Sequence, residues 1–338
     1  MTADPPQVVY TDLDGTMVGP RGCLFRAEDG ATTLAPARAL LRLLDAGVTL
    51  VLVSGRTAPQ LTEAARLLGA DGFIGEMGAV LGWDAGREVR VLPGEIPDRL
   101  LAGAATPYEA ILRTGVVDLL LQRHAGRLEL HSPWHAGHQA DVLLRGLVDP
   151  PSVEAELAAA GLGWLRLHDN GTLPVGAGAV LPGTTLDLTP TAGLDTGLDT
   201  ALDTAAAPLH VYHLMAAGLD KGAGIAADLA RRGLRRDQAV AVGDSASDLA
   251  MAGHVRRLWL TANGARDATV ARRAARMPTV TVTSGSMGAG WAEAVLSAVD
   301  APTPSPQVPE TPGRPAASAR NDGAGAAQLQ HHLGAAGR

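Results

Sequence analysis

The sequence predicts an α/β protein: a doubly wound parallel sheet interrupted by an inserted α+β unit. Short apolar strands alternate with helical segments from residue 8 to residue 75, and the same alternation resumes after residue 210. Such a βαβ rhythm is typical of a parallel sheet covered by helices. Between about residues 83 and 209 the rhythm stops, and short strand-like pieces mix with helical ones. The break indicates a separate unit inserted into the sheet.

The elements of the first sheet half follow from local patterns. Residues 8–11 are β-branched and aromatic, and residues 48–53 are nearly all apolar, as in strands buried on both faces. Apolar residues recur at helical spacing over 34–46, and a second helix is expected over 59–68. A third strand is expected at 72–75.

The inserted unit is expected to hold four strands and two helices. The expected strands are 88–92, 118–121, 127–130 and 164–167, and the expected helices are 136–147 and 152–160. A low-complexity loop covers 184–208, where Leu-Asp-Thr recurs every four residues. A calcium loop would need additional carbonyl and carboxylate ligands, so a flexible surface insertion is favoured.

The sheet resumes with a helix over 221–232, in which Asp228 and Arg232 form an (i, i+4) pair. Further strands are expected at 239–242, 258–261 and 280–283, and they complete the sheet. Beyond residue 300, Pro, Ala, Gly and Gln dominate, which is typical of disorder. We therefore expect a sheet core of residues 1–82 and 210–300, an insert of residues 83–209, and a disordered tail of residues 301–338.

Composition excludes several classes of protein. A net charge of -7 argues against a nucleic-acid binder, which usually carries a basic face. Cys23 has no second cysteine to pair with in the chain, which fits a reducing compartment. Neither a signal-peptide pattern nor an apolar run of membrane-spanning length is visible. The expectation is a soluble cytoplasmic protein without a membrane or nucleic-acid partner.

Four short polar segments occur at strand or helix boundaries. They are Asp12-Leu13-Asp14-Gly15-Thr16, Ser54-Gly55-Arg56, Asp220-Lys221-Gly222 and Gly243-Asp244-Ser245-Ala246-Ser247-Asp248. In open α/β sheets, reactive groups collect at the carboxyl ends of the strands, near the point where strand order reverses. Asp12, Ser54 and Asp244 each follow an expected strand, so one fold would bring them together.

These residue types suit phosphoryl transfer. The carboxylate of Asp12 is the candidate nucleophile, because it can attack phosphorus and form an aspartyl-phosphate. Asp14 could protonate the leaving oxygen and then accept a proton from the hydrolytic water. Lys221 would neutralise Asp12 and a phosphoryl oxygen, and the turn Ser54-Gly55-Arg56 would bind the phosphoryl group.

Asp244 and Asp248 add negative charge where phosphate must bind. A magnesium ion makes that arrangement favourable, since Mg²⁺ prefers oxygen ligands. We assign Asp12, the main-chain carbonyl of Asp14, and Asp244 as expected direct ligands. Asp248 belongs to the same metal site, where it would hold water or orient Lys221.

The four segments resemble the motifs of the haloacid dehalogenase-like (HAD) hydrolase superfamily, and their spacing resembles its class IIB, Cof-type branch, which includes sugar-phosphate phosphatases. The resemblance covers about residues 7–297. It implies a Rossmann-like core, an inserted α+β cap that sets substrate specificity, and Mg²⁺-dependent hydrolysis of a sugar phosphate or a similar small phosphorylated metabolite. It also implies that Asn263 lines the phosphate site.

The chain departs from the branch at two positions. Met77 stands where the branch often has Asn, and Ser247 precedes Asp248 where the branch often has Asn. Because Asp14 is present, dehalogenation is disfavoured. Phosphohexomutase remains an alternative enzyme, and a non-catalytic phospho-ligand sensor remains an alternative of another class.

The insert offers two further sets of candidate residues. His131, His135 and His138 have a spacing that could suit zinc, but Pro133 interrupts any helix that would align the first two. They are more readily interpreted as surface or substrate-lining residues. Candidates to bind an anionic substrate are Arg113, Arg123, Arg145 and Arg166.

Overall fold

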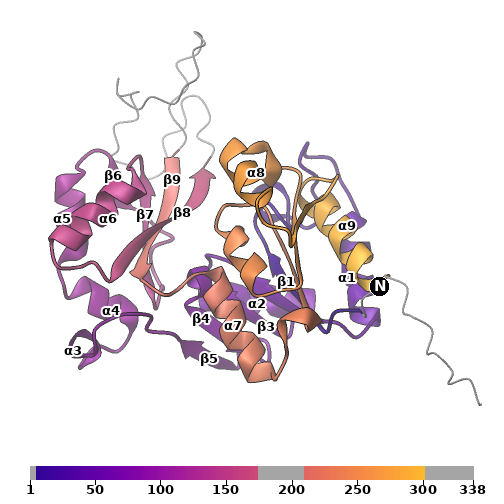
Figure 1. Ribbon diagram of the computed structural model, residues 1–338, viewed down its shortest axis with the longest axis horizontal. Coiled ribbons are helices and arrows are strands. Elements are labelled where there is room, and N and C mark those ends of the chain that lie inside the picture. Colours follow the sequence, from indigo (N-terminus) through magenta and orange to yellow (C-terminus); the bar gives the residue numbers. More distant parts are fainter. Residues whose placement is uncertain (1–4, 174–208, 301–338) are drawn as a thin grey trace, which may run out of the picture. The chain divides into compact units, whose positions relative to one another are not determined.

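The computed structural model describes residues 5–173 and 209–300 (Figure 1). The expected flexible loop at 184–208 and the expected disordered tail at 301–338 lie outside the described residues. Both sheets described below belong to one compact unit of the chain. Within the described ranges, no helix is both long and apolar enough to span a membrane.

Eight of the described strands form a large sheet in the order β12-β11-β10-β1-β2-β3-β4-β5. Its strands are β1 (Val8–Asp12), β2 (Thr49–Val53), β3 (Gly72–Gly75), β4 (Val80–Trp83), β5 (Glu88–Val91), β10 (Ala239–Gly243), β11 (Arg257–Leu260) and β12 (Val280–Val282). β4 and β5 are antiparallel to their neighbours, and the other neighbouring pairs are parallel. β1 lies between β2 and β10, so the strand order reverses beside it.

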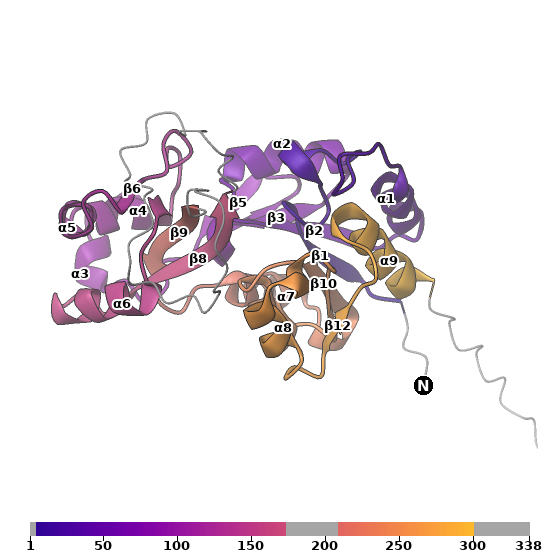
Figure 2. The same cartoon turned by 90° about the horizontal axis from the view of Figure 1, so that it is seen from above.

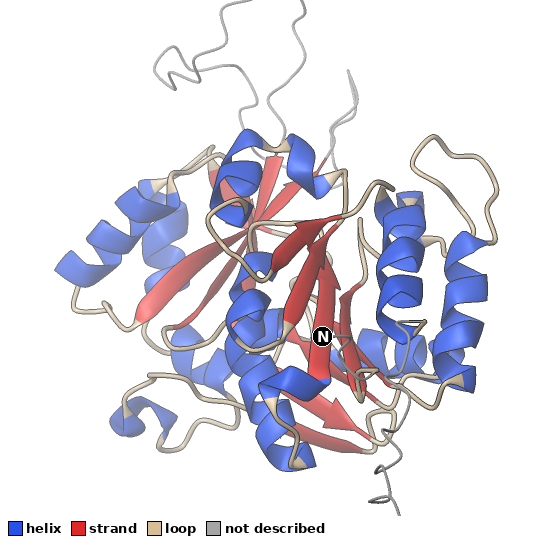
Figure 3. Cartoon of the chain, turned by 45° about the vertical axis from the view of Figure 1, so that its right-hand side comes forward, coloured by secondary structure: helices blue, strands red, loops and turns tan. Residues whose placement is uncertain are grey.

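Helices cover both faces of the large sheet. They are α1 (Ala35–Asp45), α2 (Ala58–Leu68), α7 (Lys221–Arg232), α8 (Ala268–Ala274) and α9 (Met287–Val299). Side chains of a strand alternate between faces. Val9 of β1 therefore packs in the cluster with residues of α1, α2 and α9, whereas Val8 and Tyr10 pack with residues of α7 and α8. Figures 2 and 3 show the strands between these helix layers. The fold is the doubly wound core predicted from the sequence.

The second sheet has the order β6-β7-β9-β8 and is antiparallel. Its strands are β6 (Leu128–Leu130), β7 (Asp141–Gly146), β8 (Leu165–Leu173) and β9 (Leu209–Ala216). The helices of this part of the chain are α3 (Asp98–Leu101), α4 (Pro107–Leu112), α5 (Val116–Arg123) and α6 (Pro150–Ala159). α4, α5 and α6 contact β7, β6 and β8 respectively. This sheet and its helices form the predicted α+β insert, called the cap from here on.

Two element predictions in the cap are wrong. Residues 118–121, expected as a strand, lie in helix α5, which buries Val116, Val117 and Leu120 on one face. The expected helix at 136–147 is instead a turn followed by strand β7, which is buried along its whole length between β6 and β9. Periodicity does not separate a short buried strand from a buried helical segment. Pairing with neighbouring strands decided the outcome.

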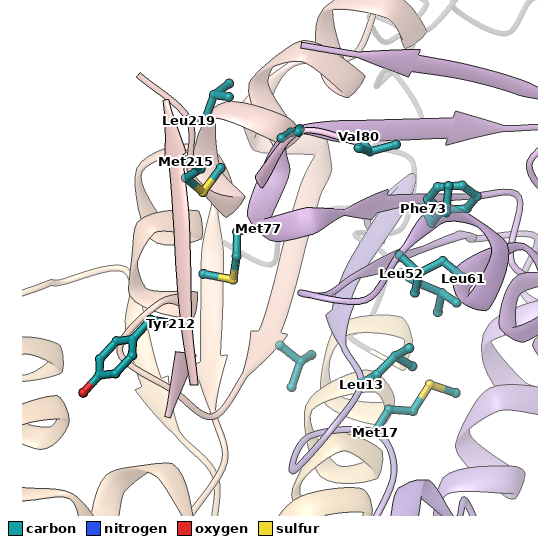
Figure 4. Packing of buried hydrophobic residues seen from close by; sticks show 14 of the residues in the cluster. Leu13, Met17, Leu52, Leu61, Phe73, Met77, Val80, Tyr212, Met215 and Leu219 are labelled. Atoms are coloured by element: carbon teal, nitrogen blue, oxygen red, sulfur yellow. The ribbon is translucent and has the colours of Figure 1, made fainter. Parts of the chain in front are cut away.

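Sheet membership does not coincide with the break in the sequence rhythm. β5 pairs with β4 in the large sheet, although the insert was expected to begin at residue 83. β9 pairs with β7 and β8 in the cap, although the core was expected to resume at residue 210. One apolar cluster also runs through both parts: it includes Met77 and Leu219 together with Tyr212 and Met215 of β9 (Figure 4). Core and cap thus share buried surface.

A buried carboxylate of helix α7 connects this helix to two strands of the large sheet, β1 and β4. Asp228 of α7 accepts hydrogen bonds from the Tyr10 hydroxyl at 2.7 Å and from the Trp83 indole at 2.6 Å. It also accepts one from Arg232 at 2.7 Å, which is the (i, i+4) pair predicted from the sequence. Asp228 is 1% exposed. Burial, followed by the charge of Asp228, raises the pKa of Tyr10 far above its usual value.

Replacing this carboxylate should destabilise the fold. Asp228→Ala leaves a tyrosine, an indole and an arginine without their shared acceptor, so we expect a loss of about 3–5 kcal/mol in the free energy of unfolding. Urea denaturation measures it. Glu63→Ala removes only an exposed pair with Arg66 and should change stability by less than about 0.5 kcal/mol. Equal losses in both variants would contradict the network's importance.

Candidate active site

The carboxyl end of β1 turns sharply beneath the loop that follows β10. Asp12 ends β1 and is 5% exposed. Gly15 has φ of +83°, and a Cβ there would lie 2.4 Å from Oδ2 of Asp244. Only glycine suits this conformation and this approach. Thr16 then donates to Oδ1 of Asp244 at 3.0 Å, so the turn brings the first and fourth motifs into contact.

Asp248 holds the loop after β10 in place. Its Oδ2 accepts from the main-chain nitrogens of Asp244 and Ser245, at 3.0 and 2.8 Å, and from the Ser245 hydroxyl at 2.7 Å. Its Oδ1 accepts from Nζ of Lys221 at 2.6 Å. Because both oxygens are engaged by the protein, Asp248 is suited to positioning the loop and the lysine.

Lys221 lies at the start of α7, which Asp220 caps through the main-chain nitrogen of Ala223. Its ammonium is 2.9 Å from Oδ1 of Asp12, and its side chain is 2% exposed. Burial alone would lower the pKa of Lys221, but the charges of Asp12 and Asp248 raise it above its usual value. The lysine therefore stays charged.

The nucleophile candidate has a perturbed pKa as well. Burial raises the pKa of Asp12 to about 7, against the lowering effect of Lys221 and with a further raising contribution from Asp248. Burial also raises the pKa of Asp244 well above its usual value, and the charges of Asp12 and Asp248 add to the shift. The site thus concentrates more negative charge than one lysine offsets.

This charge imbalance fits a cation. Asp12, Asp244 and Asp248 each offer a carboxylate oxygen, and these atoms lie within 4.8 Å of one another. A hard, oxygen-preferring ion such as Mg²⁺ suits that donor set. Asp248 is fully buried, whereas Asp12 is slightly exposed and Asp244 only partly buried, so Asp12 and Asp244 are the carboxylates best placed to bind it.

Asn263, which the motif resemblance places at the phosphate site, contacts the loops that carry Gly15 and Asp244. Its Nδ2 donates to the main-chain oxygen of Gly15 at 2.9 Å and to Oδ2 of Asp244 at 3.0 Å. Its Oδ1 accepts from the main-chain nitrogen of Met287 at 2.7 Å. Both ends of the amide are therefore bound by the protein, and Asn263 orients Asp244.

Asp14 lies apart from the buried cluster. Its carboxylate accepts from Nε and Nη2 of Arg56, at 2.8 and 2.6 Å, and its side chain is 55% exposed. Ser54, by contrast, is buried at the end of β2, and its hydroxyl accepts from the main-chain nitrogen of Arg56 at 3.3 Å. Asp14 and Arg56 therefore share the accessible side of the site.

The cap contributes residues that sequence reasoning missed. His213 of β9 and Asn170 of β8 lie against Gly55, and Asp141 of β7 contacts His213. Asp141 and His213 are 72 residues apart, so their spacing does not predict that they are in contact. Residues 136–147 were also expected to be helical, and a helix there does not predict the strand that carries Asp141. Within the described chain, His138 groups with Asp141 and His213, and the set of His131, His135 and His138, which the sequence already disfavoured as a zinc site, does not appear as a ligand group.

The cap arginines are engaged within the cap. Arg145 is 1% exposed and pairs with Glu129. Arg113 pairs with Glu109, Arg123 with Glu156, and Arg166 lies 4.0 Å from Glu154. None of these ion pairs includes a residue of the four motifs.

Comparison with known proteins identifies the fold. No family model and no curated protein sequence matches the chain. Sucrose-phosphatase from Synechocystis, solved with sucrose and phosphate, superposes with a TM-score of 0.54 at 13% identity, covering 88% of this chain and 99% of that one. A haloacid dehalogenase-like hydrolase from Bacteroides thetaiotaomicron gives 0.51 at 14% identity, with 86% and 98% covered. A Plasmodium vivax protein described as HAD/COF-like gives 0.52 at 14%, with 88% and 96% covered.

The chain therefore has the fold of the HAD-like hydrolases, including the Cof-type members, as the motif resemblance predicted. Each of these matches extends over nearly the whole of the solved chain, so core and cap are both part of the similarity. The low identities restrict the comparison to fold.

The carboxylate cluster yields a prediction about metal binding. An ion that binds only the folded chain stabilises it by mass action, by about 2.7 kcal/mol at a concentration of about 100 Kd. Mg²⁺ should therefore raise the melting temperature, and Asp244→Asn should remove most of that rise. Without Mg²⁺ the variant should be at least as stable as the parent, since it removes one of several crowded buried charges.

Differential scanning fluorimetry with Mg²⁺ or EDTA measures both effects. Glu63→Gln, on the exposed face of α2, is the matched control and should keep the full Mg²⁺ shift. An unchanged Mg²⁺ shift in Asp244→Asn would place the ion elsewhere.

Proposed function

We propose that the chain is a Mg²⁺-dependent phosphomonoester hydrolase that acts through an aspartyl-phosphate on Asp12. The observation that carries the proposal is the pairing of buried Asp12 with Lys221 at the point where strand order reverses, with a second, accessible carboxylate at Asp14. A nucleophile needs a fixed position and a nearby positive charge, whereas an acid/base group needs access to substrate and water.

In the first step, a carboxylate oxygen of Asp12 forms a bond to phosphorus while the bond to the leaving oxygen breaks. Asp14 supplies a proton to that oxygen, so the alcohol leaves neutral. Ser54 and the turn through Gly55 and Arg56 bind the phosphoryl oxygens, and Lys221 offsets their charge. A Mg²⁺ ion held by Asp12, Asp244 and the main-chain carbonyl of Asp14 would supply further charge neutralisation.

In the second step, Asp14 accepts a proton from water, which attacks phosphorus and breaks its bond to Asp12. Inorganic phosphate leaves and the Asp12 carboxylate is restored. Arg56 must release Asp14 before either proton transfer, because both oxygens of Asp14 accept from the guanidinium. An incoming phosphate offers Arg56 an alternative bidentate partner. Asp248 and Asn263 position Lys221 and Asp244.

The substrate we propose is a sugar phosphate or a similar small phosphorylated metabolite. The similarity in fold to a sucrose-phosphatase supports this class, as does the cap over the site. The acidic net charge disfavours nucleic acid. A single cysteine supports a cytoplasmic location. Phosphohexomutase and a non-catalytic sensor are the alternatives, and the experiment below separates them.

Substitution of Asp12 and substitution of Asp14 should block different steps of the reaction. Asp12→Asn should abolish turnover, because an amide is a poor nucleophile and a weak metal ligand. Asp14→Asn should still be phosphorylated by p-nitrophenyl phosphate, whose leaving group needs no proton. Water activation should slow, so rapid quench and mass spectrometry should find one phosphoryl group on Asp12. Glu63→Gln should turn over at the parent rate.

Other outcomes favour other functions. Absence of the adduct in Asp14→Asn, with turnover retained in the parent, would indicate direct attack by water. Binding without turnover in the parent would indicate a sensor. Transfer of the phosphoryl group from Asp12 to a second hydroxyl of a bisphosphorylated sugar would indicate a mutase.

A further inference from the structure

Two side chains of the cap, His213 and Asn170, lie against Gly55 of the motif Ser54-Gly55-Arg56. A Cβ built on Gly55 would lie 2.8 Å from Nε2 of His213 and 2.8 Å from Nδ2 of Asn170. His213 is 1% exposed. The absence of a side chain at position 55 therefore lets an imidazole and an amide of the cap approach the turn directly.

The same two side chains reach the fourth motif. Oδ1 of Asn170 accepts from the Ser247 hydroxyl at 3.5 Å, and Nδ2 of Asn170 is 3.4 Å from Nε2 of His213. Gly55 follows β2 and Ser247 follows β10, the two neighbours of β1. His213 and Asn170 therefore bridge the carboxyl end of β1, which carries Asp12.

Asp141 fixes the imidazole of His213. Asp141 is fully buried, and its carboxylate contacts Nδ1 of His213 with one oxygen and Nδ1 of His138 with the other. Burial would raise the pKa of Asp141, but the charges of His213 and His138 and their hydrogen bonds hold it well below its usual range. Nδ1 of His213 is held by Asp141, and Nε2, the other ring nitrogen, faces Gly55.

The core sets the position of Asp141. Oε2 of Glu76 accepts from the main-chain nitrogens of Gln139 and Ala140, at 2.8 and 2.7 Å, and lies 3.8 Å from Nδ1 of His138. Glu76 itself has a positive φ of 46° and is fully buried. Backbone strain of this kind persists where the surrounding structure enforces it, often at functional sites.

We propose that His213 contacts the substrate's leaving group through Nε2, and that Asp141 is its positioning residue. In an in-line displacement the leaving oxygen points away from the nucleophile. Asp12 approaches from the buried core, so the leaving group extends towards the residues that bridge the end of β1. The long contacts of Asn170 are weak hydrogen bonds that a ligand oxygen can replace. The inference rests on the proposed hydrolase and specifies its substrate: a phosphomonoester whose leaving group carries a hydroxyl or carboxylate oxygen.

The test compares three substrate types in the full chain with Mg²⁺. p-Nitrophenyl phosphate has no such oxygen near the ester, hexose phosphates offer hydroxyls, and phosphorylated hydroxy acids offer a carboxylate. His213→Ala should lower kcat/KM for the best hexose phosphate or hydroxy-acid phosphate by about tenfold or more, mainly through KM. It should change p-nitrophenyl phosphate turnover by less than about threefold. The substrate type with the larger loss identifies the oxygen as hydroxyl or carboxylate.

Two further variants separate contact from structure. His213→Gln keeps a hydrogen-bonding group in the same place and should recover part of the lost kcat/KM. Asp141→Asn should lower kcat/KM for the same substrates without affecting the turnover of p-nitrophenyl phosphate. The matched control is His210→Ala, also on β9. Nδ1 of His210 lies 2.7 Å from Oδ2 of Asp169, and His210 is not among the nearest neighbours of Gly55. It should leave the substrate ranking unchanged. Circular dichroism and melting curves verify that each variant is folded.

Several outcomes would overturn the inference. Equal losses for all substrates in His213→Ala would mean a structural role, and unchanged kinetics would mean that no contact exists. Stoichiometric transition metal in the purified protein, lost in Asp141→Asn, would mean that His138, Asp141 and His213 form a metal site instead. If the parent hydrolysed none of the substrates, the proposed hydrolase function would be contradicted, and this inference with it. If the parent is active and His213→Ala leaves its kcat/KM unchanged, only this inference is wrong and the proposed function stands.

Discussion

The ammonium of Lys221, buried between Asp12 and Asp248, is the interaction on which the site depends. Two carboxylates cannot be buried together without compensation, and the lysine supplies it. Its position follows from the start of α7, and Asp248 in turn fixes the loop after β10. The site is therefore assembled from three parts of the chain: the end of β1, the loop after β10 and the start of α7. The carboxylates of the site outnumber its buried lysine, a charge balance that favours a cation.

A second constraint couples the cap to this assembly. The apolar cluster that contains Met77 continues into the cap at Met215, and Glu76, directly before Met77, binds the main chain of the cap at residues 139 and 140. Met77 replaces an expected polar residue, and here it packs as part of the shared core. The junction consequently combines apolar burial with a few directed hydrogen bonds. Such a junction can define where cap side chains such as His213 stand relative to Gly55.

Much of the fold could be predicted because the large sheet carries strong local patterns. Its central strands are apolar runs, and Asp12, Ser54 and Asp244 follow them directly, so a parallel sheet requires these residues to converge. The cap was harder. Its short strands are recognised only by their partners, and 136–147 and 118–121 were assigned the wrong element for that reason. Its sheet also joins strands from distant parts of the chain, so its edges did not coincide with the break in rhythm.

The sequence by itself determined the class of fold, the four motifs and the chemistry of their residues, because strand order and residue type follow from local pattern and from the geometry of parallel sheets. The tertiary structure alone decided how those groups are used. It turned the Asn263 amide towards Gly15 and Asp244, joined Asp14 to Arg56, and brought His213 of the cap against Gly55. Each is a contact between residues far apart in sequence, and such contacts depend on packing, which no local pattern encodes.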